Sequence, residues 1–588
     1  MNRRDLLKLA AAAGMAGAGI AYPGARSFAA GPAYDLAVER TRITVDGRTT
    51  PALAIGGSVP GPVLRWKEGE EVVVRVINRT DEPTSIHWHG LLLAGVMDGA
   101  PGFNAFVAIQ PGETTTYRFQ LRQSGTYWYH SHSAGQEQSG MYGAIVIEPA
   151  RAEPVKADRD YVVLLSDHTA EDPGEILRKL KSNPEAYVTR QRTVGDFFND
   201  VGRNGLGATV SDRLMWGQMR MSPTDLADVT GYQFLMNGMG SQDNWTGVFK
   251  GGERVRLRIV NGSSMTFFDV RIPGLKMTVV AADGQNVVPV PVDEFRFGVG
   301  ETYDVIVSPK GDRAYTIMAE PIDRSGFVRG TLAPRPGMEA AIPPLRARAL
   351  LSMGDMGSMG GMAGMDHGSM AGMDHSSMSG SSGAMAGMDH SKMSGMGGTK
   401  PDAMAGMDHS SMPGMAGMGS MVSQPGGSAA APIGWSAAGT LPGEKALAYE
   451  DLKSLVPRAD DRPPVQEVVV NLNGVMNRYN WTLNGKRFDQ ATPIRVVQGE
   501  RVRIRYVNDN MMAHPMHLHG MFVELENGQT TRKPLKHVTI VKPGTEVSVI
   551  LTATEVGEWP FHCHLLYHMN AGMMTRFVVE PRRLASSR

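Results

Sequence analysis

Short runs in which apolar and polar residues alternate recur along this chain, and one of these runs occurs three times. The copies are residues 69–78 (GEEVVVRVIN), 252–261 (GERVRLRIVN) and 499–508 (GERVRIRYVN). Each copy opens with a glycine turn signal, continues with side chains that alternate between two faces, and ends in asparagine. The pattern predicts three equivalent β-strands, one in each of three related units.

The spacing of the copies is too long for a solenoid and suits β-sandwich domains of about a hundred residues or more. We therefore expect an all-β chain with sandwich domains at residues 31–150, 151–345 and 431–588. Residues 171–230 interrupt the β pattern, and the stretches 175–180 and 212–219 within them are predicted to be helical or irregular. We interpret this region as an insertion in the second domain, without assigning it a role.

Residues 346–430 consist mainly of Gly, Ser, Ala and Met, and 18 of the 39 methionines of the chain lie there. Such a composition cannot bury a core, and disorder is expected. The phrase Met-Asp-His-x-x-Met occurs four times in the segment. Its Met and His side chains suit Cu(I), whereas an inert linker is the alternative. The candidate Cu(I)-binding residues are Met365, His367, Met373, His375, Met388, His390, Met407 and His409.

Composition and the N-terminus restrict the class of protein. Lys and Arg together number 59, as do Asp and Glu, which argues against nucleic acid as a partner. One cysteine allows no intrachain disulfide. Residues 1–30, with Arg3-Arg4 before an Ala/Gly-rich run, are typical of a twin-arginine export signal, and a cytoplasmic protein with a basic terminus is the alternative. We expect a periplasmic protein with no membrane span.

The only cysteine lies in residues 562–573, HCHLLYHMNAGM. If this segment is a strand, Cys563 points to one face and the flanking histidines to the other. A thiolate, two imidazoles and a weak axial thioether form the ligand set of an electron-transfer copper. Cys563, His568 and Met573 provide three of these ligands, and a histidine of residues 514–519 (HPMHLH) can provide the fourth.

Two further histidine pairs, at residues 87–90 (HWHG) and 130–132 (HSH), occur early in the chain. Any one pair could be an ordinary surface or core pair. However, ten of the 16 histidines lie in the four motifs, four lie in the Met-rich segment, and only His168 and His537 lie elsewhere. This concentration predicts metal binding.

The threefold repeat provides an internal comparison. Nine and eleven residues after the final asparagine, the first and third copies reach histidines, whereas the second copy reaches Val270 and Ile272. In the later strand, Ser131 takes the position that Cys563 has in the third copy. The middle domain is therefore predicted to lack copper ligands, and only the third domain can hold a thiolate-bound copper.

In order and spacing, the four motifs resemble those of the multicopper oxidases, and the Met-rich repeats and twin-arginine signal resemble the branch associated with copper resistance. The resemblance implies three Greek-key cupredoxin domains and four coppers. It implies type 1 copper on His514, Cys563, His568 and Met573, and type 2 copper on His87 and His517. It places one type 3 copper on His89, His130 and His564, and the other on His132, His519 and His562.

The resemblance also implies a route for electrons and protons. Electrons would pass from type 1 copper through Cys563 to the adjacent imidazoles, and Asp98 would supply protons, although Asp-Gly is also a common turn pair. Relatives often carry an acid at the positions of Met569 and Asn570, so a second proton relay is in doubt.

The expected activity is oxidation of Cu(I) coupled to reduction of oxygen to water, by a chain that we expect to be a monomer. Cu(I) could bind at Asp509, Met511 and Met512, or the two methionines could simply pack over the ligand loop. A laccase-like oxidation of phenols is the alternative activity, and a copper-sequestering protein with incidental turnover is the third possibility.

Overall fold

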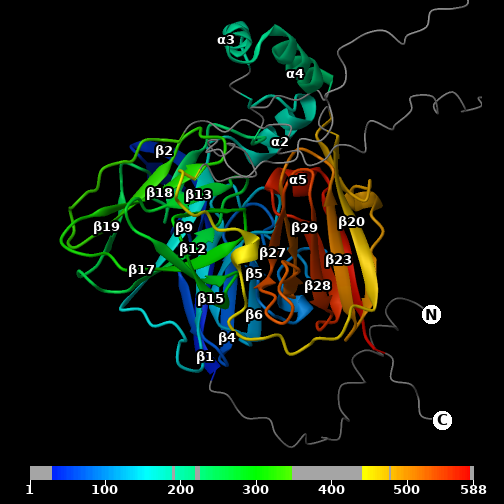
Figure 1. Cartoon of the computed structure of the whole chain (residues 1–588). Coiled ribbons are helices and arrows are strands. Elements are labelled where there is room, and N and C mark those ends of the chain that lie inside the picture. Colours follow the sequence, from blue (N-terminus) through cyan, green and yellow to red (C-terminus); the bar gives the residue numbers. More distant parts are fainter. Residues whose placement is uncertain (1–29, 189–191, 219–225, 347–439, 476–477, 583–588) are drawn as a thin grey trace, which may run out of the picture. The chain divides into compact units, whose positions relative to one another are not determined.

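The computed structural model describes residues 30–188, 192–218, 226–346, 440–475 and 478–582 (Figure 1). The predicted export signal and the Met-rich segment, with its eight candidate Cu(I)-binding residues, lie outside the described residues, apart from Ala30 and Arg346 at their edges. Across the described ranges the chain forms six β-sheets, two in each third of the fold. The all-β prediction is thereby confirmed.

The strands pair in the following orders. The N-terminal unit has the sheet β2-β1-β4-β6 (Arg48–Ile55, Ala30–Val45, Glu71–Asn78, Thr114–Gln120) and the sheet β3-β8-β7-β5 (Leu64–Lys67, Tyr142–Glu148, Gly125–His130, His87–His89). The middle unit has the sheet β10-β9-β12-β17-β14-β15 (Gln233–Met236, Arg159–His168, Val255–Asn261, Thr302–Val307, Met277–Ala282, Gln285–Val292) and the sheet β11-β19-β18-β13-β16 (Trp245–Val248, Val328–Ala333, Tyr315–Pro321, Phe268–Arg271, Glu294–Phe297).

The C-terminal unit repeats this arrangement. One sheet is β21-β20-β23-β28-β25-β26 (Asn480–Leu483, Gln466–Val475, Arg501–Asn508, Glu546–Thr552, Val523–Leu525, Leu535–Lys536). The other is β22-β30-β29-β24-β27 (Ile494–Val497, Met574–Glu580, Gly557–Cys563, His514–Leu518, Val538–Val541). Short 3-10 turns lie at Gly95–Met97, Tyr449–Asp451 and Phe488–Gln490.

The three copies of the repeated sequence are β4, β12 and β23, and each occupies the same position in its sheet. Each pairs in parallel with the first strand of its unit and antiparallel with a later strand. The final asparagine is buried in every copy, and its side-chain amide donates to backbone carbonyls of the loop that follows and of a neighbouring strand or loop. This bond explains why the repeat ends in asparagine.

Helices form the insertion in the middle unit: α2 (Pro173–Ser182), α3 (Val194–Asn204) and α4 (Leu206–Gln218). The predicted stretch 175–180 lies in α2, and the stretch 212–219 lies in α4 as far as Gln218, with residue 219 outside the described residues. Asp172 caps α2 by accepting from the Glu175 backbone N–H at 3.1 Å. Figure 1 shows α3 and α4 projecting from the sheets.

The middle helix of the insertion, α3, was not predicted, because glycine, asparagine and two adjacent phenylalanines make its sequence a weak helix former. A capping box stabilises its first turn: the Thr193 hydroxyl accepts from the Asp196 backbone, and the Asp196 carboxylate accepts from the Thr193 N–H at 2.7 Å. Arg213 of α4 adds an ion pair to Asp200 of α3.

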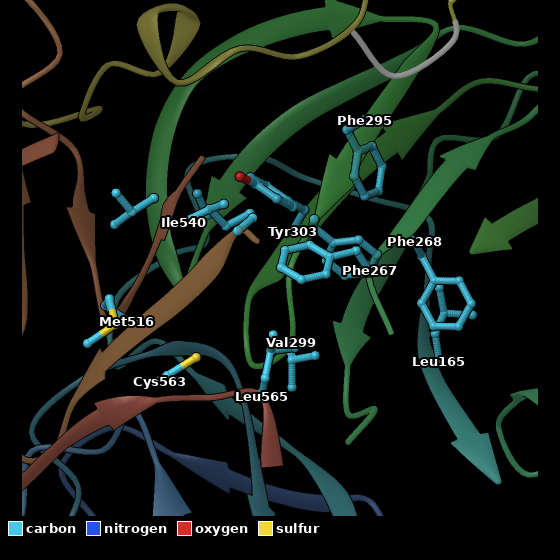
Figure 2. Close-up of a cluster of buried hydrophobic side chains, with 14 of the residues drawn as sticks. Leu165, Phe267, Phe268, Phe295, Val299, Tyr303, Met516, Ile540, Cys563 and Leu565 are labelled. Carbon is cyan, nitrogen blue, oxygen red and sulfur yellow. The ribbon is translucent and has the colours of Figure 1, made fainter. Parts of the chain in front are cut away.

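The middle and C-terminal units share one hydrophobic core, which contains the cysteine. Figure 2 shows Cys563 and Leu565 close to Val299 of the middle unit, and Met516 on the strand beside Cys563. The N-terminal unit has its own core around Trp66, Trp88 and Tyr117. Among the described helices, none has the length and apolar character required to cross a bilayer.

Candidate metal centre

Paired strands bring the histidine motifs together. In the N-terminal unit β5 runs antiparallel to β7, with His87 opposite His130. In the C-terminal unit β24 runs antiparallel to β29, with His517 opposite His562. The ring centroids of His87 and His519, which come from different units, are only 3.8 Å apart. The four motifs therefore form one site between the first and last units.

One group of donors consists of Cys563 and two histidines. The Cys563 Sγ atom lies 3.5 Å from Nδ1 of His514 and 3.7 Å from Nδ1 of His568, and the two Nδ1 atoms are 3.2 Å apart. All three residues are buried. The short helix α5 (Leu566–Ala571) carries His568 back toward the cysteine. This is a compact S,N,N donor set of the kind that holds type 1 copper.

Met573, the predicted axial ligand, is fully buried beside this group. Its backbone carbonyl accepts from Cys563 N–H at 3.1 Å, and its own N–H donates to His568 O at 3.0 Å. Burial raises the pKa of the Cys563 thiol, so the thiolate requires a bound cation.

The other eight motif histidines form overlapping groups of close ring nitrogens. His89 is grouped with His130 and His564, and His132 with His519 and His562. His87 is grouped with His517 and His519. The first two groups have the membership that the resemblance implies for the two type 3 coppers. Which copper each group holds remains a prediction.

Strand alternation separates the two kinds of site. Cys563 faces His514 and His568, whereas His562 and His564, one residue on either side, belong to the two histidine triads. The thiol donor set and the histidine cluster are therefore linked by single peptide units on each side of Cys563, as the alternation of side chains in a strand predicts.

The inner nitrogens of the cluster fit a metal. Buried Nε2 atoms of His87, His130, His132 and His517, and both ring nitrogens of His89 and His564, have no hydrogen-bond partner within the described protein. Burial, helped by neighbouring imidazoles, lowers the pKa of His89 and His130 well below the usual value. Neutral imidazoles with unpartnered lone pairs are metal ligands, and leaving them empty would be costly.

The outer nitrogens of several other cluster histidines are held by acceptors, which fixes those rings. Nδ1 of His517 lies 2.6 Å from the carbonyl O of His537, and Nδ1 of His562 lies 2.9 Å from Cys563 O. A carbonyl only accepts, so Nδ1 carries the proton and Nε2 is left for the metal. Second-sphere bonds of this type orient metal ligands and raise their basicity.

Two buried carboxyl groups also support cluster ligands. Asp98, the predicted proton source, accepts from Nδ1 of His519 at 2.8 Å, and its backbone carbonyl accepts from His87 at 2.8 Å. It thus contacts ligands from both ends of the chain, while its role in proton supply stays a prediction. The carboxyl of Glu137 lies 2.9 Å from Nδ1 of His130, and burial raises its pKa well above the usual range. Sequence reasoning missed Glu137.

The middle unit contains no predicted ligand, yet it holds the cluster in place. Asp283 accepts from the backbone N–H groups of His537 and Val538, at 3.0 and 3.1 Å. This fixes the His537 carbonyl that accepts from His517. Lys536, fully buried, pairs with Asp283 at 3.1 Å and with Glu301 at 2.9 Å.

His537 itself lies against the cluster. Its ring centroid is 4.8 Å from that of His89. A Cβ atom on Gly90 would come within 2.5 Å of the His537 ring, so the last residue of the HWHG motif must be glycine. His537 is one of only two histidines outside the motifs and the Met-rich segment, and this isolated position in the sequence was the one indication that it could belong to the site. The other, His168, bonds to Thr50 at 2.7 Å.

The candidate Cu(I) site in the described residues is not gathered into one open surface. Met511 and Met512 are buried in the shared core, with 7% and 3% exposure, whereas Asp509 is exposed. This burial favours the alternative in which the two methionines pack over the ligand loop.

Comparison with known proteins agrees with this geometry. Three multicopper oxidase family models match residues 37–152, 159–342 and 461–583. Copper resistance protein A of Escherichia coli is 48% identical over 608 residues, covering 98% of this chain and 99% of the relative. This chain belongs to the multicopper oxidase family. It is an oxidoreductase that acts with oxygen, and its cofactors are four coppers: one type 1, one type 2 and two type 3.

Other proteins are similar to this chain in sequence or in structure. The copper resistance protein A homolog of Pseudomonas syringae pv. tomato is 48% identical over 591 residues, covering 98% of this chain and 99% of the relative. The laccase from Botrytis aclada is similar in structure, with a TM-score of 0.63 at 20% identity, over 93% of this chain and 87% of the laccase. Fet3p, a multicopper oxidase that functions in iron import, has a TM-score of 0.63 at 17% identity, over 93% of this chain and 90% of Fet3p. These structures support the fold.

Replacing the thiol tests the separation of the two sites. We expect Cys563→Ser to abolish the blue absorption and oxidase turnover while the cluster keeps its copper, because no other cysteine exists and Ser131 occupies the equivalent strand position in the first unit. Absorption, metal content and oxygen uptake of the purified variant check this. A variant that stayed blue and active would contradict the type 1 assignment.

The contribution of the middle unit is tested by Lys536→Met. Methionine is similar in size to lysine but uncharged, so the carboxylates of Asp283 and Glu301 lose the cation between them. We expect it to weaken type 2 copper binding by about tenfold or more, since loss of support behind a ligand typically costs 10–100-fold. Electron paramagnetic resonance measures the type 2 signal. Lys276→Met, which removes an exposed ion pair to Asp293 in the same unit, is the matched control and should leave that signal unchanged.

Proposed function

We propose that this multicopper oxidase is a periplasmic cuprous oxidase, which converts Cu(I) to Cu(II) and thereby contributes to copper resistance. The observation that carries the proposal is the direct linkage, through residues 562–564, of a buried thiol–imidazole donor set to a cluster of eight imidazoles, of which only His132 is partly exposed. A one-electron acceptor site is thus joined to a site large enough for three coppers.

When bound, the coppers supply one-electron acceptance from the donor and four-electron reduction of oxygen to water. The protein supplies the arrangement. Cys563, His514, His568 and Met573 hold the acceptor copper, and the eight cluster histidines hold the others. Most of these side chains are buried, and burial lowers the pKa of His517 well below the usual value, which favours its neutral, metal-binding form. The Asp98 carboxylate accepts a hydrogen bond from Nδ1–H of His519, and this position allows it to pass protons to the cluster.

Cu(I) as donor is supported by the nature of the relatives and by the cover over the type 1 ligands. The full-length relatives at 48% identity are copper resistance proteins, whereas Laccase-2 of Botryotinia fuckeliana is 32% identical over 47% of this chain and 42% of its own length. His514 and His568 are fully buried, and Trp481 stacks on His568 with centroids 3.8 Å apart. Direct contact of a bulky phenol with either imidazole would therefore require the covering side chains to move.

The periplasmic location rests on Arg3-Arg4 and the Ala/Gly-rich run that follows, which are typical of twin-arginine export. This pathway exports folded proteins, so the coppers could be inserted on either side of the membrane. Fractionation of cells that express the chain, with Arg3→Lys/Arg4→Lys as the control, tests the location.

The choice of donor is tested by comparing Cu(I) and a phenol side by side on the copper-loaded protein. We expect Cu(I) to have the higher kcat/KM, with consumption of four Cu(I) per O2 because oxygen reduction to water takes four electrons. Steady-state oxygen uptake measures both. Preference for the phenol would favour the laccase-like alternative, and Cu(I) binding without oxygen uptake would favour a sequestering protein.

The Met-rich segment is proposed to bind Cu(I) weakly and to raise its concentration near the C-terminal unit. Tethered sites act through effective concentration. Replacing residues 347–430 by a Gly/Ser spacer of equal length should raise the KM for Cu(I) severalfold, reduce bound Cu(I) per chain, and leave phenol oxidation equal or faster. Unchanged Cu(I) kinetics and stoichiometry in the spacer variant would show that the segment is only a linker.

A further inference from the structure

A carboxylate from the helical insertion lies behind one of the type 1 histidines. Asp228 Oδ2 is 2.6 Å from Nε2 of His568, and both residues are buried. Leu226 and Val229, which flank Asp228, pack in the shared core. The insertion, which had no role from the sequence, therefore reaches the centre of the C-terminal unit.

The contact determines which ring nitrogen of the imidazole carries the proton. A carboxylate accepts, so Nε2 of His568 carries the proton, and Nδ1 is free to face Cys563 Sγ and His514. His514 lacks such a partner: its Nε2 lies 2.9 Å from the amide oxygen of Asn510. The two type 1 imidazoles are thus supported unequally, one by an anion and one by a neutral amide.

Tyr479 shares the same carboxylate. Its hydroxyl donates to Asp228 Oδ2 at 2.8 Å, and the tyrosine is fully buried. This second donor withdraws part of the carboxylate's negative charge from His568. Across the described residues, the carboxylate is held by one histidine and one tyrosine, both from the C-terminal unit.

We propose that Asp228 is a positioning residue for the type 1 site, which fixes the orientation and tautomer of His568 and lowers the reduction potential of the copper, and that Tyr479 moderates this effect. A carboxylate behind an imidazole N–H makes the ring a stronger donor, and a stronger donor stabilises Cu(II) relative to Cu(I). The insertion in the middle unit is then part of the electron-accepting site. The inference rests on the assignment of His568 to type 1 copper and not on the choice of Cu(I) as donor.

Asp228→Asn keeps the shape and removes the charge. We expect it to raise the type 1 reduction potential and to weaken Cu(II) binding at this site by about 10–100-fold. Tyr479→Phe should shift the potential in the opposite direction, because the carboxylate then bonds to His568 alone. Redox titration of the blue band gives the potential, and competition with a chelator gives the affinity. In the metal-free protein, ¹⁵N NMR of His568 should show Nε2 protonated in the native chain, with a weaker hydrogen bond in Asp228→Asn.

Asp304→Asn is the matched control. Asp304 is equally buried, accepts from Thr126 at 2.7 Å and pairs with Arg258 at 3.0 Å, but it contacts none of the predicted ligands. It should reduce stability without moving the potential. An unchanged potential and affinity in Asp228→Asn would overturn the proposal and leave Asp228 as a packing residue. If that variant takes up no type 1 copper, Tyr479→Phe decides: a lowered potential supports the proposal, and an unchanged one overturns it.

Discussion

The structure depends on the cost of burying imidazole nitrogens that no protein group satisfies. Eight histidines from the first and last units meet in one site, and most of their inward nitrogens have no partner among the described residues. An unpaired buried polar atom costs about 1–3 kcal/mol, so an empty cluster would make the contact between the two units less stable. Copper bound to these nitrogens would remove this penalty and stabilise the contact between the first and last units.

The middle unit has no predicted ligand, but it stabilises the positions that copper requires. Asp283 and Glu301 surround the buried Lys536, and Asp283 also binds the backbone that supports His517. A buried ion pair is of little benefit to stability on its own, because desolvation offsets the attraction. Here the ion pair holds Asp283 in the position from which it fixes the backbone of His537 and Val538.

Support behind the ligands differs among the predicted copper sites. Backbone carbonyls lie behind His517 and His562, which gives neutral support in the cluster. Asp98 and Glu137 lie behind His519 and His130, on the side where oxygen reduction consumes protons. Asp228 lies behind His568, where no proton is consumed and the electron-donating strength of the ring is what matters.

The sequence by itself determined the ligand types, the three related units and the separation of Cys563 from its histidine neighbours, because repeats and strand alternation are local properties that residue spacing records. It also indicated helices at α2 and α4, although α3 was missed because capping and contacts with α4 outweigh its weak propensity. Only the tertiary structure decided which carboxylates support the ligands. Asp228 and His568 are 340 positions apart, and Asp98 and His519 are 421 apart. The family resemblance had indicated Asp98 as a proton source, but not its bond to His519. Glu137 and Asp228 were missed, because aspartate and glutamate are common surface residues and nothing in the local sequence marks the few that packing buries against an imidazole.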